Sequence, residues 1–136
     1  MTRGKPKEAP SEQDSPWKEI LEQFFPEFLA FFFPLVHTRL DWSKGYSFKD
    51  KELQRVVREA QTKSRRVDKL AAVYLQGGAE VWVLIHIEIQ GQAEAEFPER
   101  MFIYHYRIYD RYRVPVASLA LLTDDQASWR PQQYQH

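Results

Sequence analysis

The chain has 136 residues, of which 43% are apolar and 15% aromatic, as in a single globular domain with a core of its own. No apolar stretch approaches the roughly 20 residues of a membrane span, and the charged N-terminus excludes a secretory signal peptide. The absence of cysteine excludes disulfides and thiolate metal sites and favours a cytoplasmic protein. Basic and acidic residues number 19 each, so a nucleic-acid partner would have to be bound by local patches of charge.

The first predicted element is an aromatic helix. Ser15-Pro16 is a typical helix start, and the apolar residues that follow recur at helical spacing. Pro26 should kink or split this helix, and Pro34 should end it. Its aromatic side chains should lie in the core, and the surplus of phenylalanine in residues 24–33 could form the interface of a homodimer.

A second helix and a β-hairpin follow. Residues 35–47 are expected to be irregular, and an amphipathic pattern predicts a helix over residues 50–60. Two β-prone runs, 66–75 and 80–90, are separated by Gln-Gly-Gly at 76–78, which predicts an antiparallel hairpin.

The last elements are a helix over residues 98–113 and a short strand over residues 116–122. The order is therefore helix, helix, strand, strand, helix, strand. A helix between the second and third strands permits a parallel crossover, so the sheet should be mixed. The pattern predicts an α/β fold with a central mixed sheet flanked by helices.

The folded domain is expected to span residues 14–125. Residues 1–13 have no hydrophobic periodicity and are expected to form a disordered leader. The tail, 126–136, is polar and looks truncated, as if a longer protein continued beyond it.

Two carboxylates are candidates for a metal site. Glu88 and Gln90 project from one face of the second hairpin strand, about 7 Å apart, and the end of that strand should lie beside Asp68. Neighbouring carboxylates repel each other unless a cation lies between them, and Mg²⁺ is usually held by one or two carboxylates plus substrate phosphate. The alternative is a solvated strand end in which Asp68 forms a salt bridge with Arg65 or Arg66.

A family resemblance supports the metal site. The segments RRVDKLAAVYL, VLIHIEIQGQ and FPERMFIYHYRIYDRY resemble the PD-(D/E)XK nuclease-family transposases, also called recombination-promoting nucleases. The resemblance runs from about residue 14 to 125 and implies a restriction-endonuclease-like core that cleaves DNA with Mg²⁺ or Mn²⁺. Asp68 would take the aspartate position of the motif, Glu88 the (D/E) position and Gln90 the lysine position. Glutamine is usual in the transposase branch, but its amide supplies no positive charge.

The resemblance also implies a further acid from an upstream helix. Glu52 is the first choice, and Glu19 and Glu22 on the aromatic helix are the alternatives. His86 shares the face of Glu88, where it could reach the metal or pack behind the ligands.

Two basic groups are candidates for DNA contacts. Three arginines of the 98–113 helix fall within about 40° of one another, beside a tyrosine: Arg100, Tyr104, Arg107 and Arg111. They could bind phosphates, or form a solvated face paired with Glu99 and Asp110. A second basic group surrounds the start of the first hairpin strand: Lys63, Arg65, Arg66 and Lys69. It could contact a DNA backbone or serve as ordinary surface charge.

The leading hypothesis is a metal-dependent DNA endonuclease domain of a transposase, with Asp68 and Glu88 as metal ligands and Gln90 positioning water or phosphate. The second hypothesis is a catalytically inactive nuclease-like module that binds DNA or a protein. A third is a nuclease core that lacks a C-terminal part needed for activity.

Overall fold

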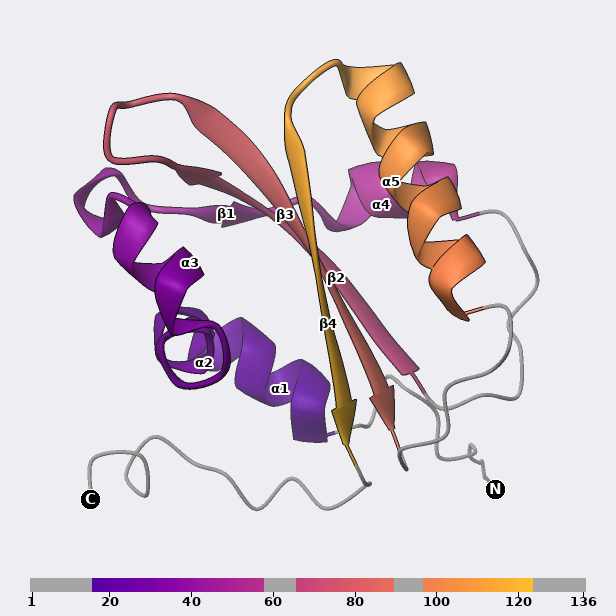
Figure 1. Cartoon of the computed structure of the whole chain (residues 1–136), viewed down its shortest axis with the longest axis horizontal. Coiled ribbons are helices and arrows are strands. Elements are labelled where there is room, and N and C mark those ends of the chain that lie inside the picture. The colour runs from indigo at the N-terminus through magenta and orange to yellow at the C-terminus, as the bar shows by residue number, and fades with distance from the viewer. Residues whose placement is uncertain (1–15, 58–65, 90–96, 124–136) are drawn as a thin grey trace, which may run out of the picture.

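A computed structural model describes residues 16–57, 66–89 and 97–123 (Figure 1). In chain order the elements are α1 (Pro16–Gln23), α2 (Phe25–Phe32), α3 (Pro34–Arg39), the 3₁₀ helix η3 (Trp42–Lys44), β1 (Ser47–Phe48), α4 (Asp50–Val56), β2 (Arg66–Tyr74), β3 (Glu80–Ile89), α5 (Phe97–Tyr112) and β4 (Val116–Thr123). The expected leader (1–13) and tail (126–136) lie outside the described residues. None of the helices in the described ranges is long and apolar enough to cross a membrane.

The strands form one four-stranded mixed sheet in the order β1-β2-β3-β4. β1 pairs with β2 and β2 with β3 in antiparallel fashion, whereas β3 and β4 are parallel and joined through α5. In the turn between β2 and β3, Gly78 has a φ of 99°, a conformation that favours glycine. The predicted α/β class, hairpin and mixed sheet are thus confirmed.

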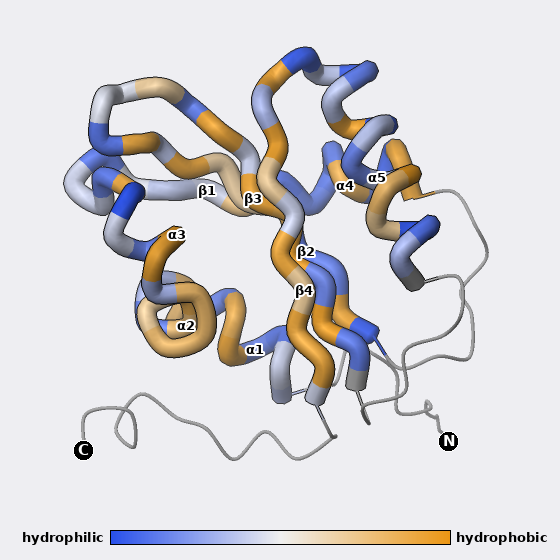
Figure 2. Tube along the Cα trace, viewed as in Figure 1, coloured by the Kyte–Doolittle hydropathy of each residue, from blue (hydrophilic) through white to orange (hydrophobic). Residues whose placement is uncertain are grey.

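Helices cover both faces of the sheet. Figure 1 shows α1, α2 and α3 on one side and α4 and α5 on the other. Hydrophobic residues run along α2 and β4 (Figure 2). Successive strand residues point to opposite faces, so odd-numbered residues such as Val83 and Ile85 pack with α1 and α2, and even-numbered ones such as Leu70 and Leu84 pack with α4 and α5. The sheet therefore has two cores, and the side chains of Asp68 and Glu88 belong to the α5 face.

The aromatic helix is split at Pro26, as predicted, because this proline lies in the first turn of α2. The prediction of irregular structure over 35–47 was wrong, since α3, η3 and β1 occupy this range. Tertiary contacts order it: the backbone N–H of Asp41 donates to the carbonyl of Tyr74, and β1 pairs with β2. The ring of Phe25 also packs against Tyr46, with centroids 5.0 Å apart.

A buried lysine joins two of the helices. Lys69 of β2 is 1% exposed, and its ammonium donates to Glu22 of α1 at 2.6 Å and to Asp50, the first residue of α4, at 3.2 Å. The ammonium also lies 4.5 Å from the ring centroid of Phe48. Lys69 was proposed as a DNA contact or a surface charge, and its burial excludes both roles in this structure.

The Lys69 contact gives an expected pH dependence. The hydrogen bond from Lys69 outweighs the opposing effect of burial and, with the charge of Lys69 and smaller contributions from Lys18, holds the pKa of Glu22 below its ordinary value of 4.5. A lowered folded-state pKa stabilises the protein above the unfolded-state pKa, and this contribution is lost as the pH falls through the folded-state pKa. Glu22→Gln should therefore lower the urea midpoint at pH 7, and the difference from wild type should shrink below about pH 4.5.

The matched control is Glu19→Gln, because Glu19 is an exposed carboxylate of the same helix that contacts Gln23 rather than Lys69. A wild-type advantage over Glu22→Gln that stays constant from pH 7 to pH 3 would contradict the assigned role of the Lys69 contact.

Candidate functional site

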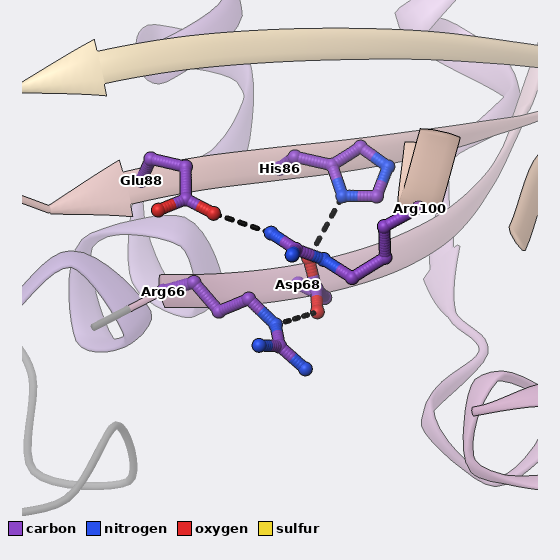
Figure 3. A network of polar contacts seen from close by, with 5 residues as sticks. All are labelled: Arg66, Asp68, His86, Glu88 and Arg100. Atoms are coloured by element: carbon purple, nitrogen blue, oxygen red, sulfur yellow. Dashed lines mark hydrogen bonds and ion pairs between the residues drawn. The ribbon is translucent and has the colours of Figure 1, made fainter. Parts of the chain in front are cut away.

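Five charged or ionisable side chains gather on the α5 face of the hairpin, at the end remote from its turn (Figure 3). We call them the carboxylate cluster: Arg66, Asp68, His86, Glu88 and Arg100. The strand register opposes Arg66 to Glu88 and Asp68 to His86. Even spacing along both strands puts all four on one face, and α5 covers that face and supplies Arg100. The predicted proximity of Asp68 and Glu88 is therefore observed, with the two residues diagonal to each other.

Both oxygens of Asp68 are engaged. Oδ1 lies 2.9 Å from Nδ1 of His86, and Oδ2 accepts a hydrogen bond from Nε of Arg66 at 3.2 Å. Burial by itself raises the pKa of Asp68, but the hydrogen bonds and the electrostatic attraction of His86 and Arg66 outweigh it and hold the pKa below its ordinary value. Asp68 is thus an ionised carboxylate held from two sides by its own hairpin.

Glu88 is paired across elements rather than within the hairpin. Its side chain is 1% exposed, and its Oε2 accepts a hydrogen bond from the guanidinium of Arg100, whose side chain is 11% exposed. Figure 3 shows the Arg100 side chain extending from α5 toward the Glu88 carboxylate. A buried carboxylate requires such a partner, because an unpaired charge out of water is costly.

Arg66 contributes to the electrostatics of both carboxylates. Burial by itself lowers the pKa of Arg66, but the charge of Asp68, with smaller contributions from Tyr104 and Glu88, raises it above its ordinary value. The cluster therefore holds two carboxylates and two guanidiniums, and the arginines neutralise the negative charge that a cation would otherwise compensate. Arg66 was predicted to contact DNA, but it is 5% exposed and is instead an internal ion-pair partner.

Tyr104 and His86 form a buried pair of stacked rings next to Asp68. Tyr104 of α5 is fully buried, and its ring stacks on that of His86 with centroids 6.1 Å apart. Tyr104 was predicted to contact nucleic acid; burial makes it a core residue instead. His86 is 1% exposed and contacts Asp68, so it lies behind this carboxylate, as one of the two alternatives for His86 anticipated.

The remaining candidates for DNA contacts are dispersed. Arg107 donates from its guanidinium to the carbonyl of Val56, so it ties α5 to α4 rather than extending the cluster. Arg111 is exposed and its guanidinium lies over the ring of Tyr112. Arg65 and Gln90 lie outside the described residues. The predicted arginine stripe is therefore divided, with Arg100 alone of its three members in the cluster.

The predicted third acid does not join the cluster in the described structure. Glu52 lies near the C-terminal end of α5, where its carbonyl accepts a hydrogen bond from the Tyr112 hydroxyl, about 18 Å along the helix from Arg100. Glu22 is bound to Lys69 on the opposite face of the sheet, and Glu19 is an exposed residue of α1 that contacts Gln23. The side chains next to the two carboxylates are instead basic residues.

The donor chemistry fits a hard divalent cation, since Asp68 and Glu88 present carboxylate oxygens on one face and such oxygens are the ligands of Mg²⁺. Within the described ranges, however, no group of three or more His, Asp or Glu side chains is arranged to hold a metal ion. Cation binding at these carboxylates would therefore have to displace or share their arginine partners, with the remaining ligands from substrate and water.

The register of β2 and β3 follows from the position of the turn, and it places Arg66 and His86 next to the two carboxylates. Once the turn opposes Tyr74 to Glu80, counting back along both strands opposes Arg66 to Glu88 and Asp68 to His86. Opposite charges placed directly across an antiparallel pair are a stabilising pattern.

Comparison of the chain with protein-family models, with curated proteins and with solved structures gives no match.

Proposed function

We propose that the carboxylate cluster is the metal-binding centre of a DNA endonuclease domain, of the restriction-endonuclease-like type implied by the resemblance to PD-(D/E)XK transposases. One observation carries the proposal: Asp68 and Glu88, from adjacent antiparallel strands, lie on the same face at the same end of the hairpin, beside Arg100. The mixed sheet with helices on both faces is compatible with such a core.

Each residue of the proposed centre has a distinct role. Asp68 and Glu88 would hold Mg²⁺ or Mn²⁺, and the bound ion would polarise a phosphoryl oxygen and lower the pKa of a coordinated water. His86 orients Asp68 through Nδ1, as partners of metal ligands commonly do. Arg100 would bind a phosphate of the DNA, and Gln90 would position water or phosphate through its amide.

The test is nicking of supercoiled plasmid DNA by the purified chain. We expect relaxed product in Mg²⁺ or Mn²⁺, none in EDTA, and full recovery when metal is added back in excess. Activity that persists in EDTA would contradict the proposal.

The second candidate is a catalytically inactive nuclease-like module that binds DNA or a protein. The pairing of Arg66 with Asp68 and of Arg100 with Glu88 favours it, because both carboxylates are already compensated without a metal. DNA binding that is unaffected by EDTA, without nicking in any metal, would favour this module.

A further inference from the structure

Resting on the proposed function, we propose that Arg100 is an exchangeable counter-ion of Glu88: it neutralises the carboxylate while no cation is bound, and turns to a substrate phosphate when a cation takes its place. Arg100 would then couple metal binding to DNA binding, so that neither the ion nor the phosphate is bound tightly without the other.

The first observation is the contact itself. Arg100 and Glu88 form an ion pair in which the carboxylate is 1% exposed and the guanidinium side chain 11% exposed. A cation at Glu88 would meet the positive charge of Arg100 at close range, and like charges in a poorly solvated place repel strongly. A cation and Arg100 therefore compete for the same carboxylate.

The second observation distinguishes Arg100 from the other basic partners. His86 belongs to β3 and Arg66 to β2, and these two strands are paired along their length, from Arg66–Glu88 to Tyr74–Glu80. The two side chains are 1% and 6% exposed, respectively. Arg100 comes from a helix instead, and its side chain is the most exposed of the three. Arg100 can leave Glu88 by a change of its side-chain rotamer, whereas release of His86 or Arg66 from Asp68 would disturb the buried hairpin.

The third observation is the position of Arg100 in α5. The structure describes α5 from Phe97, and Arg100 lies in the first turn of the described helix, where the helix dipole disfavours cations and favours anions. A phosphate near this turn would be attracted by the helix end and could accept two hydrogen bonds from the guanidinium. The same location that makes Arg100 an exchangeable partner of Glu88 thus favours its phosphate-bound state.

Competition at Glu88 has a reciprocal consequence. Any group that draws Arg100 away from Glu88 must strengthen cation binding, and a bound cation must strengthen phosphate binding by the same factor. Removal of the guanidinium should therefore strengthen cation binding at Glu88, as a bound phosphate would.

The experiment is calorimetric titration of Mn²⁺ into four forms of the full chain at pH 7: wild type, Arg100→Gln, Glu88→Gln and Arg113→Gln. Arg113→Gln is the matched control. Arg113 is an exposed arginine directly after the C-terminal end of α5, remote from Glu88, where it pairs with Asp110. Arg100→Gln should bind Mn²⁺ about tenfold more tightly than wild type or more, Arg113→Gln should match wild type, and Glu88→Gln should bind more weakly than all others.

A measurement on the wild type keeps the test valid if Arg100→Gln fails to fold. Side-chain Nε–Hε NMR signals of the arginines are followed during a Mg²⁺ titration. The Arg100 signal should shift in step with Mg²⁺ and lose the signature of its Glu88 contact, whereas the Arg66 signal should keep the signature of its hydrogen bond to Asp68.

The outcomes separate this inference from the proposed function. Equal Mn²⁺ affinity in wild type and Arg100→Gln, weaker binding by Arg100→Gln, or an Arg100 signal unmoved at Mg²⁺ saturation would overturn the counter-ion role and leave the metal centre standing. Absence of Mn²⁺ binding in every form would overturn both.

Discussion

Glu88→Gln should lower the rate of Mg²⁺-dependent plasmid nicking by about 100-fold or more. The substitution retains the size of the side chain but removes the charge that would hold the ion, and a bound ion supplies several kcal/mol of transition-state stabilisation, of which each 1.36 kcal/mol is a factor of ten. The measurement is the initial rate of loss of supercoiled plasmid. Glu80→Gln is the matched control, since Glu80 lies on the same strand but at its exposed end beside the turn.

Loss of activity alone would not separate chemistry from folding, because Glu88→Gln removes the carboxylate partner of Arg100. We expect this variant to lose about 1–3 kcal/mol of unfolding free energy, less than a fully buried pair because Arg100 keeps some contact with solvent. The double variant Glu88→Gln/Arg100→Gln removes both charges and should regain most of the stability. Activity should stay lost in the double variant. Activity that returns together with stability would show that Glu88 acts through the fold alone.

The second large effect concerns Lys69. Replacing both of its acidic partners, in Glu22→Gln/Asp50→Asn, leaves an ammonium that is 1% exposed without a countercharge. We expect a loss of about 2–3 kcal/mol in unfolding free energy, somewhat below the range for fully buried pairs, because the two carboxylates themselves are 40% and 55% exposed. Urea denaturation at pH 7 measures it.

Lys69→Met removes the charge but preserves most of the volume, so it should cost less than about 1.5 kcal/mol. The comparison isolates the buried charge from the packing of the side chain. If Lys69→Met were as destabilising as the double variant, the cost would come from lost contacts between β2, α1 and α4 rather than from an uncompensated charge.

Much of the architecture follows from local pattern. Two β-prone runs predict β2 and β3, the Gln-Gly-Gly turn predicts their pairing, and a helix before β4 permits the parallel crossover; all three are observed. By contrast, β1 was missed because its two residues carry no periodicity, and its pairing with β2 is a long-range contact. The same holds for α3 and η3, which have few residues to show a period.

The candidate site divides in the same way. The strand pattern predicts that Asp68 and Glu88 share a face at one end of the hairpin, because the side-chain period of a strand is two and a turn sets the register. Packing between distant elements adds what the strands cannot show: Arg100 reaches Glu88 because α5 packs across this face, and Lys69, one residue from Asp68, lies on the other face and pairs with Glu22. Burial and ion pairing depend on what packs above a strand, and that is set by residues far away in the chain.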